Sequence, residues 1–321
     1  MKVIVKNFLY ITIGFYVVLF LSSTFLLLFE FVIPHGGIKV YEPIVVPIII
    51  DDRDFDEIDD TDPLNQGELV YPDDVPNILL NGEIIGTYYT DDVLLTLYHL
   101  RAFNSDVYVA DVVVRDATTI LAAFAFDIFG GKNYVQPVSA MAENNDAIFA
   151  INSDYASHYN SGYVIRNGVA YRTSASYRDA IILNYDGSVF THAEEEISID
   201  TIIDGGAWQL WSFGPVLIEN GISVASVDDG LGRSAANNPR SAFGAVGMNH
   251  YMFVTVDGRS DISEGVDIEE LAAIMMDLNC IYAYNFDGGG SATMWFDGEI
   301  VNQPSDDTER SVGDCVFIKK Q

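Results

Sequence analysis

The sequence predicts an α+β fold: a strand-rich domain with a mixed β-sheet and few helices, preceded by one N-terminal transmembrane helix. The strands are indicated by Asn-Gly and Asp-Gly pairs between apolar runs, since such pairs favour β-hairpin turns. Helical periodicity in the domain is confined to two segments, 138–144 and 266–278. The transmembrane helix is indicated by a largely apolar run of 26 residues, Phe8 to Ile33. The pairs are Asn81-Gly82, Asn167-Gly168, Asp186-Gly187, Asn220-Gly221 and Asp297-Gly298.

The apolar run is long enough to cross a membrane. As a helix it would span roughly 39 Å, which is sufficient for a bilayer with some tilt. It is longer than the core of a typical signal peptide, and no Ala-x-Ala-like cleavage site is apparent. Because Lys2 and Lys6 precede the run, the positive-inside rule makes residues 1–37 a cytoplasmic tip and signal anchor. We therefore expect a single-pass protein of the cell membrane whose C-terminal domain is extracellular.

Acidic side chains outnumber basic ones throughout the remainder of the chain. The 321 residues carry 47 acids against 16 bases, a formal net charge of −31. This charge excludes nucleic-acid binding, which needs a positive surface. Residues 51–62 contain eight acids and one arginine, and a block of like charge repels itself and stays extended. We expect an acidic linker at 38–77 and one folded domain at 78–321.

The residue types give little support to metal or redox chemistry. His158, His192 and His250 lack the spacing of metal ligands. We expect no cofactor, with carboxylate-bound Ca²⁺ as the alternative that the many acids allow. Cys280 and Cys315 lie in strand-like segments near the C-terminus, and an extracellular disulfide or two buried thiols are equally compatible with them.

A helix and two flanking strands carry the main topological prediction. Residues 251–256 and 281–286 read as strands, and in the helix between them Asp267 and Glu270 have capping-box spacing. Strand, helix and strand at this length suggest a right-handed parallel crossover. Asp257 and Asp287 would then follow the carboxyl ends of parallel strands, at one sheet edge. On adjacent strands, about 4.8 Å apart, the two carboxylates would share a pocket, whereas an intervening strand would separate them. Residues of this helix expected in the core are Ile268, Leu271, Ala272, Met275 and Leu278.

The most informative segment is 285–294, in which Asp287 is followed by Gly288, Gly289 and Gly290. Three consecutive glycines raise the entropy cost of folding, so a chain accepts them where backbone turns sharply or approaches a ligand. Successive N–H groups in such a turn can form an anion-binding concavity. A tight turn without a site is the alternative, but the flanking acid and the hydroxyl groups that follow favour a site.

Seven motifs follow one another between about Asp106 and Ile318, two thirds of the chain. They are AINSDY (150–155), SFGPVLIENG (212–221), NPRSAFG (238–244), VTVDGR (254–259), EELAAIMMDLNC (269–280), NFDGGGSATM (285–294) and ERSVGD (309–314). In this order they resemble the phosphodiester glycosidase family. The chain departs from the family where Ser153 replaces a usual glycine, Tyr155 a phenylalanine, Ser241 a threonine and Ala292 a serine. These mild changes concern the details of the substrate more than activity.

The resemblance implies cleavage of the bond between the anomeric carbon of a sugar and a phosphate. Glycoside hydrolysis commonly uses two carboxyl groups, one as acid and one as base or nucleophile. We expect Asp287 nearest to the chemistry, with Asp154 or Asp257 as its partner. A phosphate leaves more readily than a sugar alkoxide, so strong acid assistance is unnecessary.

Arginine suits a phosphodiester because its planar fork binds phosphate oxygens in bidentate fashion. We expect this role for Arg240 and Arg310, whereas Arg259 either joins them or pairs with Asp257. The assisting groups would be the N–H groups of Gly288, Gly289 and Gly290 and the hydroxyls of Ser291 and Thr293. Sugar hydroxyls would be held by Asn152 and Asn285, and the apolar face of the sugar by Trp208, Trp211 or Tyr155.

The expected function is that of a membrane-anchored extracellular hydrolase of glycosyl-1-phosphodiesters. Its partners would be the membrane and a cell-surface polysaccharide, exopolysaccharide or glycoconjugate. One alternative is a non-catalytic protein that binds anionic glycans or assists exopolysaccharide assembly. Another is a structural envelope protein in which the glycine turn only shapes the fold.

Overall fold

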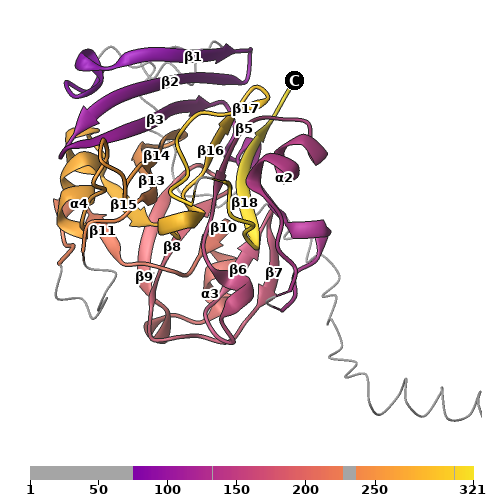
Figure 1. Ribbon diagram of the computed structural model, residues 1–321. Helices are drawn as coiled ribbons and strands as arrows, with labels where there is room; N and C mark the ends of the chain where they lie inside the picture. Colours follow the sequence, from indigo (N-terminus) through magenta and orange to yellow (C-terminus); the bar gives the residue numbers. More distant parts are fainter. Residues whose placement is uncertain (1–74, 132, 227–235, 307) are drawn as a thin grey trace, which may run out of the picture. The chain divides into compact units, whose positions relative to one another are not determined.

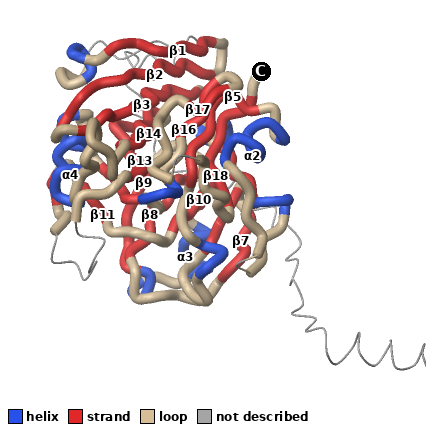
Figure 2. Tube along the Cα trace, in the orientation of Figure 1, coloured by secondary structure: helices blue, strands red, loops and turns tan. Residues whose placement is uncertain are grey.

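The computed structural model describes residues 75–321 except 132, 227–235 and 307 (Figure 1). The predicted transmembrane anchor and residues 38–74 of the predicted linker lie outside the described residues. No described helix has the length and apolarity that crossing a membrane requires. The described part contains eighteen strands and three α-helices, which confirms a strand-rich domain with few helices (Figure 2).

The largest sheet has eight strands, and all its neighbouring pairs are antiparallel. Long hairpins build one half of it, while shorter strands from the C-terminal part of the chain complete the other. In spatial order the strands are β1 (Glu83–Tyr89), β2 (Val93–Ala102), β3 (Ser105–Val114), β14 (His250–Val256), β13 (Arg240–Gly247), β15 (Tyr282–Asn285), β11 (Val216–Glu219) and β12 (Ile222–Ser223).

Two five-stranded sheets make up most of the remaining structure. The first contains, in spatial order, β7 (Val169–Arg172), β6 (Val164–Arg166), β10 (Ala207–Trp211), β8 (Asp179–Asn184) and β9 (Val189–Ala193). The second contains β17 (Glu299–Ile300), β16 (Met294–Phe296), β5 (Ala147–Asn152), β18 (Asp314–Lys319) and β4 (Leu121–Phe124). The α-helices are α2 (Val138–Asn144), α3 (Ile199–Asp204) and α4 (Ile268–Asp277).

The predicted mixed sheet is wrong, because every described strand pair is antiparallel. The prediction made β14 and β15 parallel to each other, either as neighbours or with an intervening strand. They do run in the same direction, but β13 lies between them and pairs antiparallel with both. Asp257 and Asp287 therefore leave the same sheet edge with a strand between them, at the point where Arg240 begins β13.

Local signals in the sequence predict most turns correctly. Four of the five Asn-Gly and Asp-Gly pairs connect hairpin strands, whereas Asn81-Gly82 ends a 3₁₀ turn instead. At Asn167-Gly168 both residues have positive φ, 52° and 74°, which asparagine and glycine tolerate best. The capping box of α4 is present, with Asp267 and Glu270 each bonding the other's backbone N–H.

The eight-stranded sheet has a different partner on each face. One face packs against both smaller sheets around aromatic side chains, and Phe243 lies 5.2 Å from both Phe253 and Trp211 between ring centroids. The other face is covered by the predicted apolar side of α4. Cys280 belongs to the layer beneath α4 and Cys315 to the second five-stranded sheet, so both are buried free thiols without a disulfide. Burial raises the pKa of each thiol.

Candidate functional site

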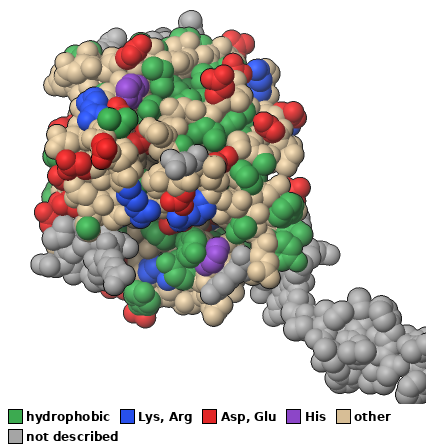
Figure 3. All heavy atoms as spheres, in the orientation of Figure 1, with side chains coloured by type: hydrophobic (Ala, Val, Ile, Leu, Met, Phe, Trp, Pro, Cys, Tyr) green, Lys and Arg blue, Asp and Glu red, His purple; other side chains and the backbone are tan. Residues whose placement is uncertain are grey.

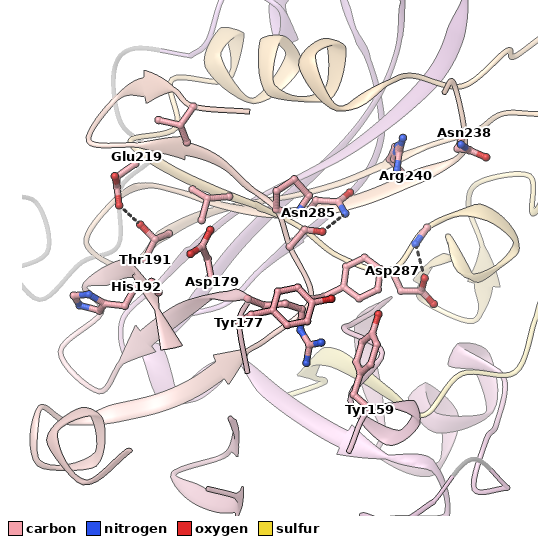
Figure 4. Close-up of a pocket in the computed structure, with 18 of the residues that line it drawn as sticks. Tyr159, Tyr177, Asp179, Thr191, His192, Glu219, Asn238, Arg240, Asn285 and Asp287 are labelled. Carbon is pink, nitrogen blue, oxygen red and sulfur yellow. Dashed lines mark hydrogen bonds between the residues drawn. The ribbon is translucent and has the colours of Figure 1, made fainter. Parts of the chain in front are cut away.

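A cleft of about 1010 Å³ opens at the end of the eight-stranded sheet where β15 finishes and β13 begins. Figure 4 shows Asp287 and Arg240 at one end of it and Asp179, His192 and Glu219 at the other. Basic side chains gather near the middle of the face seen in Figure 3, in a chain where acids are nearly three times as common as bases. The predicted site residues that line the cleft are Arg240, Arg259, Asn285, Asp287, Gly288, Gly289 and Arg310.

Asp287 is half-buried and follows directly from β15. Its Oδ1 accepts a hydrogen bond from the N–H of Gly288 at 2.9 Å, and the Ser291 side chain also bonds its carboxylate. Burial raises its pKa to about 6, while Ser291, Gly288 and the charge of Arg310 oppose that rise. Above that pH the cleft therefore holds a carboxylate that is only partly solvated.

The backbone of Asp287 is fixed from the second five-stranded sheet. Its N–H donates to the carbonyl of Ser153 at 3.1 Å, and its carbonyl accepts from Asn152 Nδ2 at 2.6 Å. Asn152 Oδ1 accepts from Ser241 Oγ at 2.7 Å and from the Thr293 N–H at 3.1 Å. Asn152 is fully buried and does not line the cleft, so the structure gives it a role in holding these segments together and not the predicted role of binding a sugar hydroxyl.

Three arginines lie at the same end of the cleft as Asp287. Arg240 donates through Nε to the carbonyl of Val266 at 3.0 Å, and burial lowers its pKa to about 10, so it remains charged at neutral pH. Arg259 donates to Asn238 Oδ1 at 3.2 and 2.9 Å and does not pair with Asp257. Arg310 forms an ion pair with Asp306 at 2.6 Å. Together they place three positive charges where an anion could lie.

The glycines bring the backbone close to its neighbours. A Cβ on Gly288 would lie 2.6 Å from the carbonyl oxygen of Pro239, and one on Gly290 would overlap the guanidinium of Arg310. Gly289 has a φ of +61°, and a Cβ there would lie 2.9 Å from Arg259 Nη2. The N–H of Gly289 donates to the Pro239 carbonyl at 2.8 Å, and that of Gly288 to Asp287. These two N–H groups are thus used inside the protein, and Gly289 and Gly290 leave room for the guanidinium groups of Arg259 and Arg310.

The other two predicted catalytic carboxylates do not line the cleft. Asp257 is 4% exposed, and its carboxylate accepts hydrogen bonds from Asn302 and Gln303. Asp154 is 2% exposed and pairs with Arg166 at 2.8 Å. Of the two alternatives for Asp257, the structure shows the intervening strand, because β13 lies between it and Asp287. Asp154 is enclosed by burial, so neither predicted partner shares the cleft with Asp287.

Asp154 belongs to a fully buried charge network that the sequence did not reveal. Arg166 Nη2 bonds both Asp154 Oδ1 and Asp314 Oδ2 at 2.8 Å. Asp314 comes from β18 and Arg166 from β6, so the network joins the two smaller sheets behind the cleft. Burial raises the pKa of Asp314, and the charge of Asp154 adds to the rise in the pKa of Asp287. Asp314 is the last residue of the ERSVGD motif, and that motif was the available sequence signal for this network.

The remaining predicted residues are divided between the cleft and the interior. Gly290, Ser291 and Thr293 are buried behind the cleft surface. Asn285 lines the cleft and donates through Nδ2 to the carbonyl of Gly214 at 2.8 Å, whereas its buried Oδ1 has no hydrogen-bond partner among the described residues.

The predicted aromatic contacts are replaced by others. Trp211 is wholly buried in the core, and the Trp208 indole donates to the carbonyl of Ile120 at 2.7 Å. Tyr155 stacks on His158, outside the residues that line the cleft. The cleft is lined instead by Tyr177, which is 84% exposed, and by Tyr159, beneath the guanidinium of Arg178 at 4.0 Å from the ring centroid (Figure 4). The sequence signal that could have identified these cleft residues was the triplet Tyr177-Arg178-Asp179 at the start of β8. In the described residues, no group of three or more His, Cys, Asp or Glu side chains could hold a metal ion.

Two curated proteins are similar to this chain. One is the SPbeta prophage-derived uncharacterized protein YomE of Bacillus subtilis, 28% identical over 265 residues, which covers 74% of this chain and 40% of that protein. The other is the bovine (Bos taurus) N-acetylglucosamine-1-phosphodiester alpha-N-acetylglucosaminidase, 24% identical over 168 residues, which covers 48% of this chain and 31% of that protein. The matches thus span well under half of each relative.

Two solved structures share the fold. The zebrafish N-acetylglucosamine-1-phosphodiester alpha-N-acetylglucosaminidase catalytic domain, auto-inhibited by its pro-peptide, matches with a TM-score of 0.58 and 20% identity, over 72% of this chain and 83% of that one. A hypothetical protein from Synechocystis matches with a TM-score of 0.57 and 13% identity, over 72% of this chain and 63% of that one.

The family comparison covers the segment that builds most of the cleft. The model of the phosphodiester glycosidase family matches residues 145–319, which are 175 of the 321 residues. That segment contains all seven motifs in full, together with all the predicted site residues. This chain therefore belongs to the phosphodiester glycosidase family.

Proposed function

We propose that this chain hydrolyses glycosyl-1-phosphodiesters, breaking the bond between the anomeric carbon and the phosphate oxygen. The observation that carries the proposal is the position of Asp287 at the end of the cleft that Arg240, Arg259 and Arg310 also line. A phosphodiester is an anion that needs such countercharge, and its sugar carbon needs a carboxylate nearby. Family membership supports the same reaction class.

The three guanidinium groups would bind the phosphate and stabilise it as it leaves. During C–O cleavage the bonding electrons move to the phosphate oxygen, so negative charge grows there. Preorganised cations stabilise that growing charge more strongly than they stabilise the bound substrate. A phosphate monoester then departs without needing a proton from a strong acid, and one carboxylate in the cleft suffices.

Asp287 would act as the base. In its ionised form it accepts a proton from a water molecule as that water adds to the anomeric carbon. The water oxygen forms the new C–O bond, the sugar-to-phosphate bond breaks, and the products are a reducing sugar and a phosphate monoester. The clamp of Asn152 and Ser153 on the backbone of Asp287 would keep this carboxylate aligned.

The sugar would lie between the arginines and the tyrosines. Tyr177 presents an exposed ring to the cleft, and the guanidinium of Arg178 lies over Tyr159. Such rings suit the apolar face of a pyranose. Asn285 Oδ1, which has no hydrogen-bond partner among the described residues, would accept a bond from a sugar hydroxyl once the side chain turns slightly into the cleft.

We further propose that the enzyme works outside the cell, anchored by residues 8–33, on a cell-surface polysaccharide or exopolysaccharide. The support is the length of that apolar run, the lysines before it, and the acidic segment that follows. Accessibility of the domain to protease added to intact cells measures this directly.

Incubation of the protein with a UDP-sugar or another glycosyl-1-phosphodiester, followed by assay of reducing sugar, tests the activity. Asp287→Asn should lower kcat by about a hundredfold to ten-thousandfold. Asp297→Asn, at an exposed hairpin where Asp297 pairs with Lys320, is the matched control and should retain activity. Equal background rates for wild type and Asp287→Asn would refute hydrolysis, and calorimetric binding without turnover would identify a glycan-binding module.

A further inference from the structure

Asp257 holds the beginning of the loop that carries Arg310. Its carboxylate accepts hydrogen bonds from Asn302 Nδ2 at 2.9 Å and from the Gln303 N–H at 3.1 and 3.0 Å. Asp257 is 4% exposed and does not line the cleft. All these bonds join the end of β14 to residues 302 and 303, so they fix that segment and touch no part of the cleft.

Asn302 extends the connection to the segment after the glycine turn. Its Nδ2 also donates to the carbonyl of Ala292 at 3.1 Å, and its Oδ1 accepts from the Met294 N–H at 2.8 Å. Asn302 is buried, and hydrogen bonds shielded from water are stronger and costlier to lose. One amide thus fastens three segments, with Asp257 as its charged partner.

Residues 302 and 303 lead directly to the ion pair between Asp306 and Arg310, at the end of the cleft where Asp287 lies. Gln303 precedes Asp306 by three residues, and the Asp306 carboxylate pairs with Arg310 at 2.6 Å. A Cβ on Gly290 would overlap both members of that pair, so the pair lies directly against the glycine turn. A shift of residues 302–306 would therefore move Arg310 relative to Asp287.

We propose that Asp257, acting through Asn302 and Gln303, is a positioning residue that sets the place of Arg310 and hence the affinity of the cleft for the phosphate group. The kinetic consequence rests on the proposed function, whereas the structural one does not. This role differs from that of a second catalytic acid, because Asp257 would act on substrate only through Arg310.

A double-mutant cycle tests the proposal. Asp257→Asn keeps the shape and removes the charge, and we expect KM for a glycosyl-1-phosphodiester to rise about tenfold with kcat within about twofold. In an Arg310→Ala background the same change should alter KM by less than about twofold, because the two residues act as one unit. Asp111→Asn is the control: Asp111 is equally buried, at 4%, but bonds His250 at 2.7 Å away from the cleft, so KM should not change.

Hydrogen–deuterium exchange of peptides covering 301–306 gives a readout that does not need activity. Exchange there should accelerate in Asp257→Asn but not in Asp111→Asn. Asn302→Ala removes the same contact from the loop side, should give the same pattern, and replaces Asp257→Asn if that variant does not fold. Unchanged exchange, or kinetic losses that add fully to those of Arg310→Ala, would overturn the proposal. A wild type without turnover would defeat the proposed function alone, since the exchange result still decides the positioning.

Discussion

One carboxyl group, that of Asp287, governs the pH range of the proposed hydrolysis. Its pKa is raised to about 6, chiefly by burial. A base must be ionised, so kcat/KM should increase with pH, reach its midpoint near 6 and level off above it. A pH–rate profile checks this, and a rate that falls through the same range would make Asp287 an acid instead of a base.

Arg310 should control that midpoint through its charge. Its positive charge lowers the pKa of Asp287, so Arg310→Met should move the midpoint of the profile to higher pH while raising KM. Arg115→Met is a suitable control because Arg115 pairs with Asp92 away from the cleft. The same profile measured on both variants decides the matter, and a midpoint that stays in place in Arg310→Met contradicts the electrostatic coupling.

Tyr177 should contribute to sugar affinity through its ring. Tyr177→Ala should raise KM by about threefold to tenfold, and Tyr177→Trp should restore most of the affinity, because an aromatic contact is worth about 0.5–1.5 kcal/mol. Steady-state kinetics with the same substrate measure both. Tyr134→Ala, an exposed tyrosine outside the cleft, should leave KM unchanged. Equal KM values for all four proteins would remove Tyr177 from the sugar site.

At the scale of the element, the glycine turn should separate stability from affinity. In Gly288→Ala the new Cβ meets a backbone carbonyl, that of Pro239 at 2.6 Å, so the fold must shift and the melting temperature should fall by several degrees. In Gly290→Ala the new Cβ meets the ends of two flexible side chains, Arg310 and Asp306, which can move. That variant should fold normally and show a raised KM. Calorimetry and kinetics on both variants test the contrast, which the reverse assignment would contradict.

Element-level signals in the sequence were local, and they succeeded where the physics is local. Positive φ at Asn167 and Gly168 forms a hairpin turn from two residues alone, and the capping box of α4 spans three positions. The insertion of β13 between β14 and β15 depends on which strands meet across the sheet. No short pattern encodes that choice, and the predicted mixed sheet failed for this reason.

The candidate site was also predicted only in part, because some of its features depend on local motifs and others on contacts between distant strands. Asp287 and the arginines at 240, 259 and 310 were found because each follows or precedes a strand or turn with a recognisable motif. The burial of Asp154 depends on Arg166 and Asp314 approaching from two other strands. Arg166 is 12 positions from Asp154 and 148 positions from Asp314. Likewise, Tyr177 was not predicted because its exposure in a cleft is a property of the assembled sheets.

At the scale of the whole molecule, stability should be higher in mild acid than at neutral pH. The pKa values of Asp257 and Asp287 are raised to about 6 by burial, against an ordinary carboxyl value near 3.9. The folded state therefore holds protons that the unfolded state has released, so this stabilisation is complete below about 3.9 and is lost as pH rises through about 6. Repulsion within a chain of net charge −31 acts in the same direction.

Scanning calorimetry at pH 5 and pH 8 measures this effect. The melting temperature should be higher at pH 5, by about 2–4 °C for each kcal/mol gained. In Asp257→Asn the side chain at this position cannot ionise. The difference in melting temperature between pH 5 and pH 8 should therefore become smaller in that variant. Asp116→Asn, a change at an exposed turn where Asp116 accepts from the Thr118 N–H, should preserve it. Greater stability at pH 8 would contradict the raised pKa values.

The bond between Asn152 and the carbonyl of Asp287 also has a consequence for folding kinetics. The two residues are 135 positions apart, so this bond closes a very long loop, and contacts of that kind form slowly. Hairpins such as β2–β3 close loops of a few residues and form early. The carboxylate of Asp287 thus reaches its place in the cleft only when the sheets dock. If it has the proposed role, the recovery of activity during refolding should lag behind the recovery of β-sheet circular dichroism.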